Sequence, residues 1–184
     1  MKKKIAIRKK ILLIRKKKYF NIPSNFFNPL IKILKKKKKN KIKILSLYYP
    51  SNFEVNTLNI FQLIKKINIK TLLPVVKNNN EMNFMEWRYL DPLNVNSFGM
   101  LEPSIKTKPQ IPDLMLVPLL AFDRQNNRIG YGKGFYDKFL NKFLKKKNIL
   151  TIGVAFLFQK YNKLPVSNLD IKLDYVLTEK GLHK

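Results

Sequence analysis

The residues with the clearest chemical potential lie together at positions 128–137, in the stretch Arg-Ile-Gly-Tyr-Gly-Lys-Gly-Phe-Tyr-Asp. Glycine lets a backbone adopt positive φ and approach a ligand without obstruction by a Cβ atom. Backbone N–H groups in such a loop can converge on an anion, helped by the positive end of a following helix. Lys133 and Arg128 add cations suited to phosphate oxygens. The stretch predicts a phosphate-binding loop, although glycine spacing alone also allows a plain strand-to-helix turn.

Asp137 ends this stretch, within the first turn of the helix expected after it. A carboxylate there can cap the helix or hold Mg²⁺ beside bound phosphates. The Gly-Lys pair is not followed by Ser or Thr, so the loop is not a Walker loop, and its glycines lack the spacing of a dinucleotide fingerprint. We therefore expect a phosphate loop of another kind.

The elements that must position this loop alternate between strand and helix patterns. Such alternation predicts a three-layer αβα fold with a largely parallel central sheet, in a single domain spanning residues 1–184. Residues 94–110 are expected to be mostly loop, and the lysines at 35–39 to form a solvated, mobile tip. Helices are expected over 2–19, 26–36, 55–67 and 135–146, and strands over 42–48, 71–76, 82–88, 114–122, 149–155 and 175–177.

The charge of the chain favours a different class of protein, one that binds nucleic acid. Lys and Arg number 38 against 11 Asp and Glu, for a net charge of +27. Nearly all of the excess is Lys, however, and frequent Asn and Ile accompany it, which is what A/T-rich codons produce. A nucleic-acid reader typically relies on Arg for bidentate contacts. We interpret most of the Lys excess as solvated surface, and expect no specific nucleic-acid partner.

Several kinds of chemistry are disfavoured by residue types that the chain lacks or places badly. It has no Cys, which excludes disulfides and thiolate catalysis. Its single His183 lies next to the last residue, so histidine catalysis and histidine metal sites are not expected. No apolar run is long enough to span a bilayer. We expect a monomeric cytoplasmic protein with no membrane partner.

The sequence motifs along the chain resemble those of one family, the 5-formyltetrahydrofolate cyclo-ligases, also called methenyltetrahydrofolate synthetases. Residues 117–137 closely resemble its signature V-P-x-L-A-F-D-x-x-G-x-R-L-G-x-G-x-G-[FY]-Y-D, with Asn126 in place of the common Gly and Ile129 in place of Leu. Further similar segments keep the order of the family across the chain: Lys4 with Arg8, Leu-Tyr-Tyr at 47–49 with Phe-Glu-Val-Asn-Thr at 53–57, Leu-Pro-Val at 73–75, Phe-Gly-Met-Leu-Glu-Pro at 98–103, and Leu-Pro at 164–165 with Leu-Asp at 169–170.

This resemblance implies an enzyme that uses ATP and Mg²⁺ to close 5-formyltetrahydrofolate into 5,10-methenyltetrahydrofolate, releasing ADP and phosphate. Lys4 and Arg8 would reach the nucleotide from the N-terminal helix, although both also suit an ordinary basic helix. Lys133 and Arg128 would act on the transferred group. The implied ATP loop comprises Arg128, Ile129, Gly130, Tyr131, Gly132, Lys133, Gly134, Phe135 and Tyr136.

The resemblance also implies a folate site and a metal site. Glu54 would accept N–H bonds from the pterin, and Tyr49 would line the same pocket. Phe98 would stack against the folate, with a plain core or loop-anchoring residue as the alternative. Asp137 and Asp170 would hold Mg²⁺, with an ordinary turn carboxylate as the alternative for Asp170. A polyglutamylated substrate would suit the Lys-rich surface. A basic nucleic-acid-binding protein and an inactive relative of the enzyme stay open as alternatives.

Overall fold

The central sheet runs in the order β12-β11-β9-β6-β1-β2-β3 in a computed structural model that describes residues 2–35, 42–65, 67–77, 81–104, 108–145 and 147–184. Its five inner strands are parallel, and only the edge strands β3 and β12 pair antiparallel. The strands are β1 (Ile44–Ser46), β2 (Lys70–Val76), β3 (Met82–Glu86), β6 (Leu114–Pro118), β9 (Leu150–Val154), β11 (Tyr175–Thr178) and β12 (Gly181–His183).

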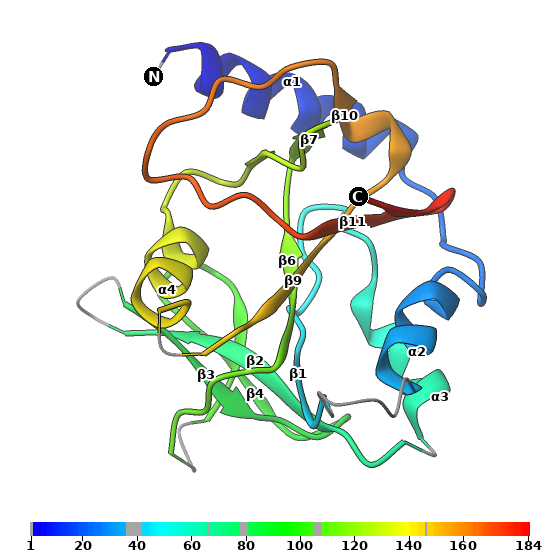
Figure 1. Ribbon diagram of the computed structural model, residues 1–184. Helices are drawn as coiled ribbons and strands as arrows, with labels where there is room; N and C mark the ends of the chain where they lie inside the picture. Colours follow the sequence, from blue (N-terminus) through cyan, green and yellow to red (C-terminus); the bar gives the residue numbers. More distant parts are fainter. Residues whose placement is uncertain (1, 36–41, 66, 78–80, 105–107, 146) are drawn as a thin grey trace.

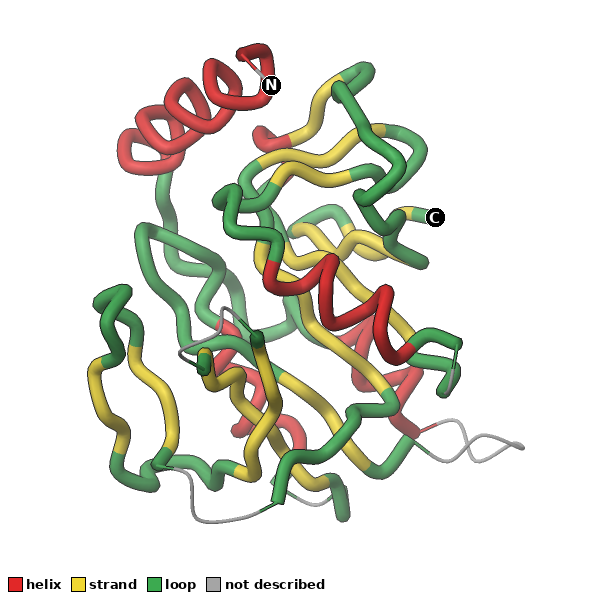
Figure 2. Tube along the Cα trace, turned by 90° about the vertical axis from the view of Figure 1, so that its left-hand side faces the viewer, coloured by secondary structure: helices red, strands yellow, loops and turns green. Residues whose placement is uncertain are grey.

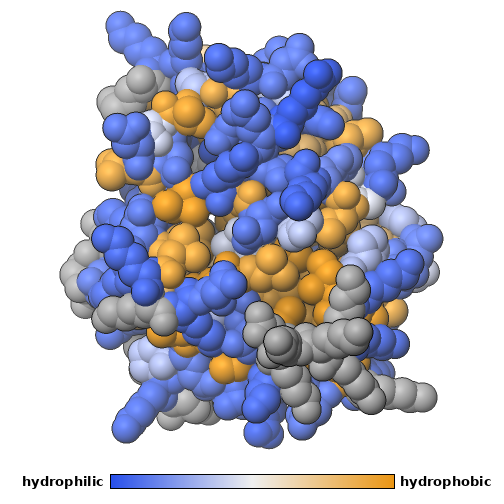
Figure 3. Space-filling view, viewed as in Figure 1, coloured by the Kyte–Doolittle hydropathy of each residue, from blue (hydrophilic) through white to orange (hydrophobic). Residues whose placement is uncertain are grey.

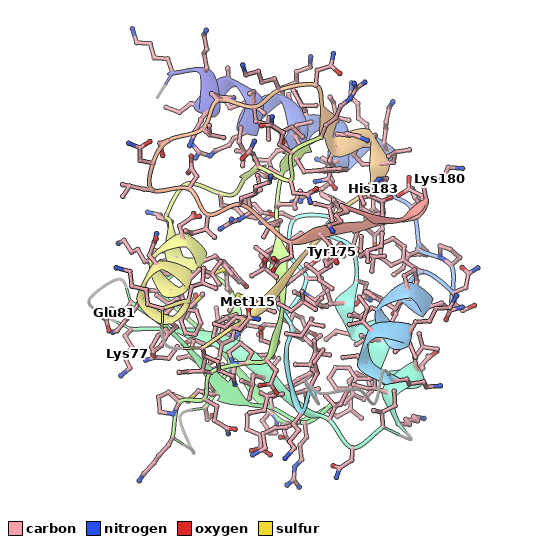
Figure 4. All side chains as sticks on the ribbon, viewed as in Figure 1. Lys77, Glu81, Met115, Tyr175, Lys180 and His183 are labelled. Carbon is pink, nitrogen blue, oxygen red and sulfur yellow. The ribbon has the colours of Figure 1, made fainter. Side chains whose placement is uncertain are left out.

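Helices cover both faces of this sheet (Figure 1), because successive side chains of a strand point to opposite faces. Leu114 and Leu116 of β6 pack into the cluster that contains α2 (Asn28–Lys35) and α3 (Ile60–Ile64). Met115 and Val117 instead join the cluster that contains α4 (Phe135–Phe143), and Figure 4 shows Met115 on that side. The predicted α/β fold with a mainly parallel sheet is thus confirmed, with helices on both sides.

A second, smaller sheet extends the molecule beyond the carboxyl end of β6. It has the order β10-β7-β8 and is formed by β7 (Ala121–Asp123), β8 (Arg128–Ile129) and β10 (Lys160–Tyr161). Helix α1 (Lys2–Lys18) lies over it at the top of Figure 1, and Figure 2 shows the same helix at one end of the molecule. Ile11 of α1 packs there against Leu120, Ala121 and Ile129. The N-terminal helix is thereby held beside the predicted phosphate loop.

The expectation of one continuous strand over 114–122 is wrong. The chain leaves the large sheet after Pro118 and enters the small sheet at Ala121. The carbonyl groups of Leu119 and Leu120 both accept hydrogen bonds from Nε2 of Gln159, at 3.0 and 2.9 Å. Gln159 belongs to the short helix η2 (Leu157–Gln159), so a side chain from far along the chain satisfies the backbone at the break.

The segment 94–110 is also more regular than expected. It contains a hairpin of β4 (Leu93–Val95) and β5 (Leu101–Pro103). Glu102 joins this hairpin to β2 by accepting hydrogen bonds from Val76 N at 3.1 Å and Asn96 Nδ2 at 2.9 Å. The hairpin is therefore fixed against the large sheet rather than left as a loose connection.

Several helices are shorter than the sequence pattern predicts. The helical pattern of 55–67 becomes η1 (Thr57–Asn59) followed by α3, because Asn56 caps the N–H of Leu58 at 3.0 Å. In α2, Pro29 occupies the first turn, a position that suits its missing N–H. Of the expected tip at 35–39, all residues but the first lie outside the described residues.

Candidate active site

A cavity of about 420 Å³ opens at the carboxyl ends of the parallel strands, the usual place for ligands in such sheets. Pro118 at the end of β6, Val76 at the end of β2 and Tyr48 just after β1 line it. The structure brings every predicted site residue to its wall. These are Lys4, Arg8, Tyr49, Glu54, Phe98, Arg128, Ile129, Gly130, Tyr131, Gly132, Lys133, Gly134, Phe135, Tyr136, Asp137 and Asp170.

Asp123 fixes the entry to the glycine loop. Its Oδ1 accepts hydrogen bonds from the N–H groups of Gln125 and Asn127, at 2.9 and 3.1 Å, and its Oδ2 accepts one from Leu164 N at 3.1 Å. Asn127 Nδ2 also donates to both carboxylate oxygens. Burial raises the pKa of Asp123, but these hydrogen bonds outweigh it and hold the pKa below its ordinary value. The turn is therefore built around an ionised buried carboxylate.

The glycines of the loop allow both its backbone shape and the approach of α1. Gly132 has φ +103° and Gly134, just before α4, has φ +70°. Arg8 donates from Nε to the carbonyl of Gly130 at 2.8 Å. A Cβ atom on Gly132 would lie 3.1 Å from Cζ of Arg8. The guanidinium group therefore occupies the space that a side chain at 132 would need.

Arg128 and Asp137 hold the chain near residue 171 from both sides. Nη2 of Arg128 lies 2.7 Å from Oδ1 of Asp137, while its Nη1 donates to the carbonyl of Ile171. The same Asp137 oxygen accepts a hydrogen bond from Ile171 N at 3.0 Å. Residue 170 directly precedes this anchored backbone, and both predicted metal-binding carboxylates line the cavity.

Asp170 is paired with the N-terminal helix. Its Oδ2 accepts hydrogen bonds from Lys4 Nζ and from the backbone and hydroxyl groups of Ser167, at 2.6 and 3.0 Å for Ser167. Partial burial raises the pKa of Asp170, but the hydrogen bonds from Lys4 and Ser167 prevail and lower it. The fold thus places Lys4, near one end of the sequence, against the ionised carboxylate of Asp170, 166 positions away.

Lys133 lies on the opposite side of the loop, against the β4–β5 hairpin. Its Nζ is 5.5 Å from the ring centroid of Phe98, a cation–π distance. Phe98 makes an edge contact with Phe135, with ring centroids 5.6 Å apart, and its side chain is 41% exposed. Phe98 is therefore not a core residue, and its contact with Phe135 suits the loop-anchoring alternative as well as a folate-facing role.

Glu54 lies at the inner end of the cavity with only 6% of its surface exposed. Its Oε2 accepts a hydrogen bond from Ser51 N at 2.9 Å, and its Oε1 accepts one from the hydroxyl of Tyr131 at 2.6 Å. Burial raises the pKa of Glu54, and its hydrogen bonds and Arg15 oppose that rise only in part. The preceding turn has positive φ at Asn52 and Phe53.

Sequence reasoning did not select Arg15 or Tyr48, which belong to this region. Tyr48 lines the cavity, and Arg15 donates from Nη2 to the hydroxyl of Tyr131. The signal for Arg15 was its place on the helical stripe formed with Lys4, Arg8 and Ile11. Tyr136 was predicted, and its hydroxyl is buried without a hydrogen-bond partner among the residues that the structure describes.

The family model for 5-formyltetrahydrofolate cyclo-ligases matches residues 1–179 of this chain. The chain belongs to the 5-formyltetrahydrofolate cyclo-ligase family. Among curated relatives, the 5-formyltetrahydrofolate cyclo-ligase of Haemophilus influenzae is 30% identical over 145 residues, covering 76% of this chain and 77% of the relative. That of Mycoplasma genitalium is 33% identical over 165 residues, covering 76% and 96%.

Solved structures give the same answer for the fold of this cyclo-ligase. A 5,10-methenyltetrahydrofolate synthetase from Aquifex aeolicus superposes with a TM-score of 0.74 at 31% identity, covering 98% of this chain and 92% of that one. One from Mycoplasma pneumoniae superposes with a TM-score of 0.71 at 27% identity, covering 95% and 97%. The prediction of an enzyme of the cyclo-ligase class is confirmed.

The charged side chains divide between the outer surface and the cavity. Hydrophilic side chains cover much of the face in Figure 3, with apolar ones showing between them. Three of the five arginines, Arg8, Arg15 and Arg128, are instead used in or beside the cavity. His183 lies beside β11 in Figure 4, bonded to Thr178 at 2.8 Å, and does not line the cavity. In the part of the chain that the structure describes, no helix combines the length and apolar character needed to cross a bilayer.

Proposed function

We propose that this cyclo-ligase closes 5-formyltetrahydrofolate to 5,10-methenyltetrahydrofolate with Mg²⁺ and ATP, releasing ADP and phosphate. One observation carries the proposal: a single cavity unites a cationic glycine loop with a buried carboxylate and aromatic side chains. The first half suits a triphosphate, and the second suits a pterin. Their union suits the transfer of a phosphoryl group to a folate.

The nucleotide half is formed by α1 and the glycine loop. Lys4 and Arg8 come from α1 and Lys133 comes from the glycine loop, and all three line the cavity. Backbone N–H groups at 130–134 and the start of α4 add donors and a favourable dipole for phosphate oxygens. Lys133 has no ion-pair partner within the described ranges, so its ammonium group is available to the transferred phosphoryl group.

Asp137 and Asp170 fit the needs of Mg²⁺. The ion typically uses one or two protein carboxylates, with phosphate oxygens and water completing its shell. Each of these carboxylates uses one oxygen for a cation of the protein, Arg128 for Asp137 and Lys4 for Asp170. The second oxygen of each forms no hydrogen bond to any residue that the structure describes. Bound Mg²⁺ would neutralise charge on the triphosphate.

The folate half is formed by Glu54 and the aromatic residues. An ionised carboxylate accepts two parallel N–H bonds, which matches the amino-pyrimidinone edge of a pterin. Tyr49 and Phe98 offer ring faces on the same cavity. A pterin bound by Glu54 would use the acceptor positions that the hydrogen bonds from Tyr131 and Ser51 leave free on the two carboxylate oxygens.

The chemistry requires activation of a poor electrophile. The formyl oxygen attacks the γ-phosphorus, the bond to the ADP oxygen breaks, and an imidate-like phosphate results. N10 then attacks the formyl carbon, loses its proton, and phosphate leaves with the former formyl oxygen. Such transfer depends mainly on positioning and charge neutralisation. Lys133 and Arg128 would supply positive charge, and no covalent nucleophile of the protein is needed.

A direct assay tests this proposal. Purified protein with 5-formyltetrahydrofolate and Mg-ATP should develop the near-ultraviolet absorbance of the methenyl product, and omission of ATP should abolish it. Glu54→Gln should raise the KM for the folate, whereas Glu86→Gln, on β3 and outside the cavity, should not. Folded wild-type protein that gives no absorbance change would show an inactive relative and overturn the proposal.

A further inference from the structure

Arg15 is a charged residue buried in a position that the proposed reaction does not explain. Its side chain is 1% exposed, on a helix whose other cations mostly face solvent. Nη1 reaches the carbonyl of Leu119 only at 3.4 Å, and Nε has no partner among the described residues. A buried guanidinium group needs compensation, because desolvation of an unpaired charge is costly. Its best hydrogen bond runs from Nη2 to the hydroxyl of Tyr131.

Tyr131 links this cation to the buried carboxylate. The phenol accepts from Arg15 and donates to Oε1 of Glu54 at 2.6 Å. Cζ of Arg15 also lies 5.6 Å from the centroid of the Tyr131 ring. The three side chains come from α1, from the glycine loop and from the turn after β1. They form an ion pair bridged by a phenol, since Glu54 is the carboxylate at the far end of the chain of hydrogen bonds.

We propose that Arg15 is a positioning residue for Glu54, which it keeps ionised and oriented through the hydroxyl of Tyr131. The proposal rests on the proposed function for the identity of the ligand, a pterin that needs an acceptor. Helix α1 would then serve both halves of the site. Lys4 and Arg8 would act on the nucleotide half, and Arg15 would act on the folate half without touching the substrate.

The surroundings of Glu54 determine the direction of the effect. Tyr48, Tyr131 and Tyr136 face it, and burial raises the pKa of each phenol, so all three stay neutral at physiological pH. Arg128 acts on Tyr136, which leaves Arg15 as the cation that lowers the pKa of Glu54. Loss of Arg15 should therefore raise that pKa further. Pterin binding needs the ionised carboxylate of Glu54. As the pH is lowered, the variant without Arg15 should therefore lose binding at a higher pH than the wild type does.

The first measurement needs no substrate. The chain has five glutamates, so the pH titration of their ¹³C-labelled carboxyl groups is resolvable by NMR, with Glu54→Gln assigning the signal. Arg15→Met should move the midpoint of Glu54 upward, and Arg15→Lys should return it towards the wild-type value. Lys16→Met removes the same charge from the exposed neighbouring position and should leave the midpoint unchanged. An unchanged midpoint in Arg15→Met would overturn the proposal.

The second measurement uses the proposed reaction. Arg15→Met should raise the KM for 5-formyltetrahydrofolate by about tenfold or more, as expected for loss of a buried charged hydrogen bond. The KM for ATP should stay near that of Lys16→Met. The effect should be less than additive with Tyr131→Phe, because both changes cut the same link. Equal changes in both KM values, with additivity, would show a merely structural residue and contradict the proposal.

Two further results separate the possible failures. If Arg15→Met does not fold, Tyr131→Phe removes the bridge while keeping the guanidinium, and it should also raise the midpoint of Glu54. An unchanged midpoint there would overturn the proposal. If the wild-type protein shows no turnover, the titration still tests the link between Arg15 and Glu54. A shifted midpoint without turnover would then support the link and count against the proposed reaction alone.

Discussion

Arg8 of α1 donates a hydrogen bond to the carbonyl of Gly130 at 2.8 Å, and its guanidinium group fills the space beside Gly132. Arg8 and Gly130 are 122 positions apart in the sequence, yet their hydrogen bond joins α1 to the glycine loop. A loop with any larger residue at 132 would push Arg8 away from the proposed phosphate site. The glycine is thus required twice, by φ +103° and by the contact.

Gly132→Ala should therefore weaken nucleotide use beyond its cost in stability. Gly181→Ala is a matched control, because Gly181 has φ +105° but no atom within 4 Å of an added Cβ. Both variants should lose about 1–3 kcal/mol of unfolding free energy through backbone strain. Only Gly132→Ala should raise the KM for ATP in the absorbance assay. Equal KM values in the two variants would contradict the role of the Arg8 contact.

Lys133→Ala should lower kcat by about 10²–10³-fold, the range seen when one donor to a developing charge is removed. Lys133 lines the cavity, whereas the exposed Lys138 on α4 does not. Lys138→Ala should keep the wild-type kcat. Thermal unfolding of both variants should match that of the wild type, which would show that the loss is chemical. A kcat loss shared by Lys138→Ala would point to general charge instead.

Asp137→Asn and Asp170→Asn should each raise the Mg²⁺ concentration for half-maximal activity, by about tenfold or more given the effects typical of metal-site changes. Titration of activity with Mg²⁺ at fixed, saturating ATP measures this directly. Asp91→Asn, in the turn after β3 and outside the cavity, provides the control. If Asp137→Asn and Asp170→Asn required the same Mg²⁺ concentration for half-maximal activity as Asp91→Asn, neither carboxylate would have a role in metal binding.

Asp123→Asn should destabilise the fold by about 2 kcal/mol at pH 7, because buried N–H groups would lose a charged acceptor. The pKa of Asp123 is lowered in the folded state, so its stabilisation is present above the unfolded value of about 4 and is lost as pH falls through the folded value. The free energy of unfolding, measured with urea at pH 7 and in this acid range, should therefore fall less on acidification in Asp123→Asn than in the wild type. Asp91→Asn should retain the wild-type pH effect.

The parts of the fold that sequence predicted were those with strong local patterns. The alternating strand and helix pattern, and the order of the motifs around Glu54, Phe98 and the glycine loop, depend on neighbouring residues and were readable. The break between β6 and β7 was not, because the apolar run continues through it and Gln159, which satisfies it, lies about forty residues away. The β4–β5 hairpin was missed for the same reason, since Glu102 fixes it through β2.

The candidate site divides in the same way. Residue types identified the cations and carboxylates, but not their partners. Arg15 shares α1 with eight lysines and Arg8, so its residue type does not distinguish it from them. It is buried, and its best hydrogen bond goes to Tyr131, more than a hundred residues away. A contact between distant side chains has no local pattern, so only the stripe of α1 carried a hint of it.

The ion pair between Lys4 and Asp170 joins residues 166 positions apart. A ribosome releases the N-terminal end first, so α1 emerges long before the carboxylate that Lys4 must meet. Closing so large a loop is slow relative to local folding. The proposed metal site would accordingly be completed only after residue 170 has been synthesised and has met α1. The proposed reaction would therefore have to wait for a contact between two segments that are made far apart in time.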